Sequence, residues 1–184
     1  MIKNRTLTPT RNSLRRMILL SFLIALQLVF SKTLAIRLPH IDITFGFFAL
    51  ALSGLILGPF YAACGAACAD VIGFILFPRG VFFIGYTLTA LLGGLVYGIF
   101  LYCKPKKLWR VIVATCIIKL GLHLGLNTFW AYLVGGRAFW AHLVTRTPAE
   151  FMQIPIQVAF IWFLAYRISE SPPALPFKKE IQKN

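Results

Sequence analysis

Charged side chains interrupt the apolar stretches of this sequence, where each is costly to bury. Asp70 directly follows a run of small residues, Ala62 to Ala69. An acid inside an apolar helix needs a partner or water, and such acids are candidates for binding or transport sites. The alternative is a structural pair between Asp70 and Lys119 or His123, which interrupt a later apolar stretch. The sequence leaves both interpretations open.

Hydrogen-bonding and aromatic side chains recur near one end of three further apolar stretches. The groups are Tyr86, Thr87 and Thr89; Asn127, Thr128 and Trp130; and Gln153 and Gln157. Polar groups at one depth on three helices predict a pocket in that half of a helical bundle. The alternative is hydrogen bonding that only ties the helices together.

Five basic residues lie in the connections next to these ends. They are Lys32, Arg37, Arg79, Arg137 and Arg146. Because only Asp42 and Glu150 oppose them, and His40 and His142 add to them, this end is expected to attract anions. The alternative for each residue is an anchor whose charged end reaches the lipid headgroups.

Residue patterns for catalysis, nucleotide hydrolysis and metal binding are missing from the sequence. It contains no Gly-x-x-x-x-Gly-Lys-Ser/Thr motif and no Gly-x-Ser-x-Gly motif. The three histidines lack metal-ligand spacing, and the four cysteines form no Cys-x-x-Cys pair. We therefore expect no enzyme activity, no metal and no cofactor.

The composition excludes a water-soluble fold. Of the 184 residues, 59% are apolar and 13% are charged, about half the roughly 25% of charged residues in soluble domains. The mean hydropathy is +0.79. An integral protein of the cell membrane remains. The net charge of +14 fits the excess of Lys and Arg on cytoplasmic loops. It does not indicate nucleic-acid binding, because no basic stretch is interleaved with aromatic residues.

Apolar stretches and their breaks predict an all-α fold of six transmembrane helices. Residues 43–77 exceed one span of about 20 residues, and Gly58-Pro59 divides them into a tight hairpin of 43–57 and 60–77. The other expected spans are 17–30 (extending towards Ile36), 81–103, 111–134 and 151–166, with a polar connection at 135–150 and a kink at Pro155. The expected parts are a basic segment, 1–16, a transmembrane domain, 17–168, and a basic tail, 169–184.

The distribution of basic residues predicts that both termini are cytoplasmic. With six spans, thirteen of the nineteen Lys and Arg residues fall on the side of the termini and five on the other side. Lys119 lies within a span. Because positive flanks resist translocation, the side with thirteen is expected to face the cytoplasm.

Small residues four positions apart indicate close helix packing. The pairs are Ser21 and Ala25, Gly94 and Gly98, and Gly121 and Gly125. Such pairs let two helix backbones approach each other, within the bundle or against another subunit.

Six regions form a recognisable series over roughly residues 15–168. They are Phe45-Gly46-Phe47 leading to Leu57-Gly58-Pro59; Ala69-Asp70-Val71-Ile72-Gly73; Phe77-Pro78-Arg79-Gly80; Gly85-Tyr86-Thr87-Leu88-Thr89-Ala90; Leu126-Asn127-Thr128-Phe129-Trp130; and Arg146 followed by Met152-Gln153-Ile154-Pro155-Ile156-Gln157. In this order they resemble the substrate-binding (S) components of energy-coupling-factor (ECF) vitamin transporters, most closely the folate-specific members. The sequence departs from the family pattern at Arg79 and at Thr147-Pro148-Ala149-Glu150.

The resemblance implies a six-helix subunit that captures folate outside the cell. It would deliver folate together with a transmembrane coupling (T) subunit and two ATPase subunits, and Ser21 and Ala25 on the first helix would contact the coupling subunit. The expected substrate-binding residues are Arg37, Phe45, Asp70, Arg79, Tyr86, Thr87, His123, Asn127, Trp130, Arg146 and Gln153.

Folate chemistry suits these residue types. Arginine can hold the two carboxylates of folate through paired hydrogen bonds, aromatic rings suit the flat pterin, and Asp70 or Asn127 suits its amide edge. Two alternatives stay open. In the first, the chain is a substrate-binding component for another vitamin, such as riboflavin, thiamine or a queuosine precursor. In the second, the chain is a stand-alone facilitator for a small molecule.

Overall fold

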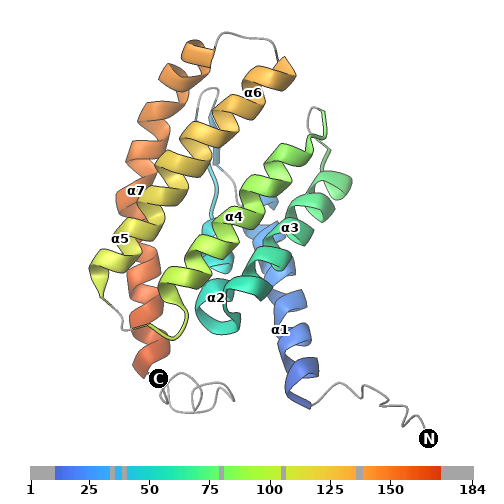
Figure 1. The fold of residues 1–184 in the computed structure, drawn as a ribbon, viewed down its shortest axis with the longest axis vertical. Helices are drawn as coiled ribbons and strands as arrows, with labels where there is room; N and C mark the ends of the chain where they lie inside the picture. The colour runs from blue at the N-terminus through green and yellow to red at the C-terminus, as the bar shows by residue number, and fades with distance from the viewer. Residues whose placement is uncertain are drawn as a thin grey trace, which may run out of the picture.

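The structure is a computed structural model, and it describes residues 11–33, 36–38, 41–78, 81–104, 107–135 and 139–170. It is a bundle of helices with a short β-hairpin (Figure 1). The elements are α1 (Arg11–Leu28), the π-helix η1 (Val29–Thr33), β1 (Ile36–Leu38), β2 (Ile41–Ile43), α2 (Gly46–Leu57), α3 (Pro59–Leu76), α4 (Ile84–Leu101), α5 (Leu108–Cys116), the π-helix η2 (Ile117–Leu126), α6 (Asn127–Gly135) and α7 (Phe139–Glu170).

The two ends of the bundle differ in what they contain. At one end, termed the terminal end, α1 begins, α7 ends and α2 turns into α3 (Figure 1). At the opposite end, termed the hairpin end, α3 gives way to α4 and α6 gives way to α7 (Figure 1). The strands β1 and β2 lie in that half of the molecule (Figure 1).

The lengths of most apolar helical stretches are sufficient to span a membrane. Five stretches are long and apolar enough to cross a bilayer: Ser13–Thr33, Pro59–Leu76, Ile84–Leu101, Leu108–Gly135 and Arg146–Ala165. The sixth apolar helix, α2, has 12 residues, so it is about 18 Å long against a hydrocarbon core of about 30 Å. The predicted all-α fold of six apolar helices is confirmed, although α2 starts at Gly46, three residues later than expected.

The turn between α2 and α3 depends on Gly58 and Pro59. Gly58 has a φ of 90°, which an L side chain rarely adopts. Pro59 is the first residue of α3, where its missing N–H is no loss to the helix. The predicted Gly58-Pro59 hairpin is therefore confirmed.

Close packing joins α4 to α3. A Cβ atom on Gly94 would collide with the carbonyl oxygen of Ala62, and one on Gly98 would collide with Cα of Pro59. In contrast, a Cβ atom on Gly121 would have no neighbouring atom of the described chain within 4 Å beyond its own stretch of helix. The small-residue prediction holds for Gly94 and Gly98, and no such contact exists at Gly121 within the described chain.

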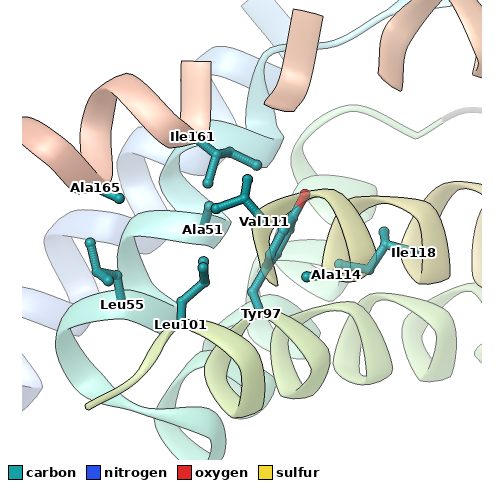
Figure 2. Close-up of a cluster of buried hydrophobic side chains, with 9 residues drawn as sticks. All are labelled: Ala51, Leu55, Tyr97, Leu101, Val111, Ala114, Ile118, Ile161 and Ala165. Carbon is teal, nitrogen blue, oxygen red and sulfur yellow. The ribbon is translucent and has the colours of Figure 1, made fainter. Parts of the chain in front are cut away.

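The apolar core fills the terminal end of the bundle. Figure 2 shows Tyr97 and Leu101 of α4 facing side chains from α2, α5 and α7, and Tyr97 is only 1% exposed. The full cluster is Ala51, Leu55, Tyr97, Leu101, Val111, Ala114, Ile118, Ile161 and Ala165. These residues therefore form the main apolar core of the described helices (Figure 2), and it lies nearer the terminal end than the hairpin end.

The predicted polar connection at 135–150 is wrong. Helix α7 begins at Phe139 and continues through Pro148 and Pro155 to Glu170, 32 residues in all. One face of its first part packs against the bundle, because Phe139, Leu143 and Glu150 are partly buried at helical spacing. Tertiary packing of this face therefore outweighs the loss of backbone hydrogen bonds at the two prolines.

The β-hairpin was not predicted. Strand β1 pairs antiparallel with β2, with Arg37 opposite Asp42. Alternation of apolar and charged residues in Ile-Arg-Leu and Ile-Asp-Ile is the period of a strand. The segment was instead expected to extend the first helix towards Ile36.

Candidate functional site

A buried lysine forms the base of the candidate site. Lys119 on η2 is 3% exposed, and its Nζ lies 2.9 Å from Oε2 of Glu150 on α7. The same Nζ donates a hydrogen bond of 2.9 Å to Oε1 of Gln153. A buried ammonium is tolerated only when it is paired and hydrogen-bonded, so these contacts fix η2 against α7.

His123 and Asn127 follow Lys119 at four-residue intervals. Nδ1 of His123 lies 3.8 Å from Oε1 of Glu150. The segment from Ile117 to Leu126 is a π-helix, whose wider turn keeps residues four apart close to one face. Such segments inside α-helices are frequent at functional sites. Here the π-helix presents Lys119, His123 and Asn127 to the same space.

That space is a cavity of about 280 Å³, close to the lower end of the roughly 300–1,000 Å³ typical of small-molecule sites. We term it the polar cavity. It is lined by Thr44, Lys119, His123, Asn127, Arg146, Ala149, Glu150 and Gln153. With His123 neutral, two cations and one carboxylate leave an excess of one positive charge in the lining.

One lining atom lacks a partner. Oδ1 of Asn127 is buried, and no described residue donates a hydrogen bond to it. A buried acceptor without a donor is unfavourable, and such groups are uncommon in folded proteins. The polar cavity therefore offers an acceptor to a ligand that carries an N–H or O–H group.

Asp70 lies in a second pocket. Oγ1 of Thr87 donates a hydrogen bond of 2.7 Å to Oδ2 of Asp70, joining α3 to α4. The surrounding pocket, of about 150 Å³, includes Lys32, Tyr86 and the ring of Phe83. Lys119 and His123, the expected alternative partners of Asp70, are instead close to Glu150.

An aromatic contact lies beside the second pocket, between Phe83 and Trp130. The Trp130 ring lies 5.4 Å from that of Phe83, and its Nε1 donates a hydrogen bond of 3.1 Å to Oγ1 of Thr89. A Cβ at Gly85 would meet Cδ2 of Trp130 at 2.6 Å, so a glycine is needed there. Trp130 is one helical turn from Asn127, which lines the polar cavity.

The structure divides the predicted site residues between these places. His123, Asn127, Arg146 and Gln153 meet in the polar cavity, whereas Asp70 and Tyr86 line the second pocket. Thr87 is bonded to Asp70, and Trp130 lies beside Phe83. The predicted residues therefore line two separate pockets, and their contact with a ligand stays a prediction.

Three predicted residues lie at the margin. Phe45 follows Thr44 of the polar cavity, and its ring lies 6.4 Å from that of Phe47. Arg37 is paired through the backbone with Asp42 in the β-hairpin, and its side chain lies outside the described part. Arg79 lies outside the described residues altogether.

The predicted substrate-binding set left out Thr44, Lys119, Ala149 and Glu150 of the polar cavity. Of the charged residues that line the second pocket, it left out Lys32. A helical pattern was present: Arg146, Ala149, Glu150 and Gln153 are spaced to share one helix face. Interpreting 135–150 as a connection concealed this face.

Ser21 and Ala25, the expected contacts of a coupling subunit, lie away from both pockets. Both are exposed on α1. Leu20, the residue before Ser21, packs against Gly65 of α3, where a Cβ would lie 2.7 Å from Cδ1 of Leu20. One side of α1 therefore binds the bundle, and the side that carries Ser21 and Ala25 stays open.

Comparisons with known proteins find a matching family and similar sequences. Residues 15–165 match the family described as the substrate-specific component of ECF transporters. The chain is 39% identical over 146 residues to the folate transporter FolT of Clostridium novyi, covering 79% of this chain and 85% of that relative. It is 33% identical to FolT of Leuconostoc mesenteroides, with coverages of 82% and 84%.

A solved structure is also similar. It is a FolT crystal structure with bound folic acid, 36% identical in sequence, with a TM-score of 0.78; the match covers 83% of this chain and 93% of that one. The family resemblance noted in the sequence is confirmed. With five helices able to span a bilayer, the chain belongs to the substrate-specific components of ECF transporters, which makes it a multi-pass protein of the cell membrane.

Proposed function

We propose that this chain is the folate-binding component of an ECF importer and that folate binds in the polar cavity. The observation that carries the proposal is the lining of this cavity, which has an excess positive charge and an unpaired buried acceptor. Folate matches both features: its two carboxylates suit the positive charge, and the N–H groups of its pterin can donate to the unpaired acceptor. The relatives named as folate transporters, and the solved relative bound to folic acid, support the choice.

The side chains of the cavity have separate roles in this proposal. Arg146 holds a carboxylate through charge-assisted hydrogen bonds. Oδ1 of Asn127 accepts a hydrogen bond from the pterin. Trp130, which lies outside the cavity lining and one helical turn from Asn127, offers an aromatic ring at the margin of the cavity. The ion pair of Lys119 and Glu150 keeps the base of the cavity in place. The chain binds its substrate and does not alter it chemically.

The proposed partners are a transmembrane coupling subunit and two ATPase subunits. The open side of α1 supports this, because Ser21 and Ala25 let another helix approach closely there. With the polar cavity nearer the hairpin end, folate would enter from outside and both termini would lie in the cytoplasm.

Isothermal titration of the detergent-solubilised chain tests the substrate. Folate is expected to bind saturably, and riboflavin, thiamine and a queuosine precursor are expected not to bind. Saturable binding of one of those three without binding of folate would assign the chain to another vitamin.

Liposomes containing only this chain test the need for partners. They are expected to bind folate without accumulating it or equilibrating it across the bilayer. Folate passage through such liposomes would identify a stand-alone facilitator.

A further inference from the structure

A basic pocket lies at the terminal end of the bundle, away from the candidate site. Its charged lining consists of Lys104, Lys107 and Arg110, and its floor includes Leu101 and Val111 of the apolar core. We term these three cations and their apolar floor the basic pocket. Neither the substrate nor the coupling contact proposed above uses it.

The path of the backbone brings the three cations together. Cys103 has a φ of 48°, which turns the chain sharply after α4 and places Lys104 over the end of the bundle. Lys107 then immediately precedes α5, and Arg110 lies in its first turn. The first turn of a helix carries partial positive charge from its N–H groups, so the backbone adds to the charge of the side chains.

Among the described residues, Nε of Arg110 has no hydrogen-bond acceptor, although this atom is buried. No described carboxylate lines the basic pocket. Arg110 is held in place by the Trp109 ring, whose centroid lies 5.3 Å from Cζ of Arg110. A buried cationic donor without an acceptor is unfavourable, and an anion from outside the described chain would satisfy it.

The surroundings of the basic pocket suit a lipid. Trp109 is 53% exposed and Leu108 is 45% exposed, so apolar and aromatic surface adjoins the three cations. The pocket lies where the span Ile84–Leu101 ends and the span Leu108–Gly135 begins. The end of a span is expected at the depth of the lipid headgroups. Tryptophan is enriched at this depth, and basic pockets between transmembrane helices bind anionic headgroups.

We propose that the basic pocket binds the phosphate of an anionic membrane lipid, with an acyl chain lying over Leu108 and Trp109. The enclosed space beside Arg110 is about 10 Å³, close to the volume that one water molecule needs. A single phosphate oxygen therefore reaches Nε of Arg110. The remainder of the headgroup stays at the mouth of the pocket, between Lys104 and Lys107.

Native mass spectrometry of the purified chain in detergent tests the proposal. The chain is incubated with equal amounts of phosphatidylglycerol and phosphatidylcholine, and the ratio of the two bound lipids is measured. Wild type is expected to prefer phosphatidylglycerol. The triple variant Lys104→Gln, Lys107→Gln, Arg110→Gln is expected to reduce that ratio by at least about fivefold.

A matched control removes the same charge elsewhere. The variant Arg5→Gln, Arg11→Gln, Arg15→Gln alters the basic N-terminal segment and is expected to change the ratio less than about twofold. Thermal melting and gel filtration check that both variants are folded. A further arm adds inorganic phosphate or glycerol 3-phosphate, which are expected to displace the lipid poorly because they lack acyl chains.

Three results would overturn the proposal. Equal binding of both lipids by wild type would show that the pocket does not select anionic headgroups. Equal losses in the two triple variants would show that total charge, and not the pocket, attracts the lipid. Efficient displacement by inorganic phosphate would assign the pocket to a free phosphate.

Discussion

At the scale of single residues, the polar cavity combines a cation with an unpaired acceptor. Replacing Arg146 or Asn127 by Ala is expected to weaken folate binding by about 1–3 kcal/mol each, because each removes a hydrogen bond to a ligand in a partly dry site. Titration calorimetry measures the change. Arg15→Ala, which removes an exposed charge at the terminal end, is the control and is expected to leave the Kd unchanged.

The second pocket provides a comparison with the polar cavity. The Asp70 carboxylate is already bonded to Thr87 and does not line the polar cavity. Asp70→Asn is therefore expected to change the Kd for folate less than Arg146→Ala does. If Asp70→Asn weakens binding as much, the ligand extends into the second pocket as well.

Lys119 and Glu150 illustrate how one buried charge depends on another. Glu150→Gln leaves the Lys119 ammonium buried without its counter-ion and is expected to destabilise the protein by up to about 3 kcal/mol. The double variant Lys119→Met, Glu150→Gln is expected to be more stable than Glu150→Gln alone. Thermal unfolding without ligand measures both, and equal stability of the single and double variants would contradict the ion pair.

At the scale of helices, α4 approaches α3 through glycine. Gly98→Ala places a methyl group against Cα of Pro59 and is expected to cost about 1–3 kcal/mol of stability, measured as a lower melting temperature. Gly121→Ala is the matched control, because the described chain leaves space around it. That control is expected to be neutral or stabilising, since alanine favours helices over glycine.

Helix α1 offers a test of the coupling contact. Ala25→Trp adds bulk on the open side of α1 and is expected to abolish ATP-driven folate uptake by the complete transporter while folate binding by the isolated chain persists. Ile99→Trp, at a position 52% exposed on α4, is the control and is expected to preserve uptake. Normal uptake by Ala25→Trp would place the coupling contact elsewhere.

The elements also show what sequence reasoning could and could not predict. Helix order and the Gly58-Pro59 turn were predictable because the length of an apolar stretch and its breaks are local properties. The helical residues 139–150 were missed because charged residues such as Arg146 and Glu150 gave the segment the local character of a polar connection. The packing that keeps it helical comes from η2 and α6, which lie outside this segment of the sequence. Similarly, polar residues at the same depth on several helices predicted a pocket. Their depth along the helices does not tell which helices lie side by side.

At the scale of the whole molecule, cysteine labelling tests the predicted orientation, in which both termini are cytoplasmic. In a cysteine-free background, Gly135→Cys at the end of α6 is expected to react with an impermeant maleimide in intact cells. Arg15→Cys near the start of α1 is expected to react only after permeabilisation. The reverse pattern would place the polar cavity towards the cytoplasm and exclude capture of folate from outside.

The shortness of α2 affects how far a captured vitamin must still move. Backbone at membrane depth must be satisfied by protein or water. We therefore expect the stretch before Gly46, which includes Thr44 of the cavity lining, to lie in a wetted recess below the headgroups. In the proposed binding mode, a molecule held beside Thr44 would have passed about two-fifths of the hydrocarbon layer. The remaining distance to the other side of the membrane would then be the length of α2, roughly three helical turns. This distance is much shorter than the full thickness of the bilayer.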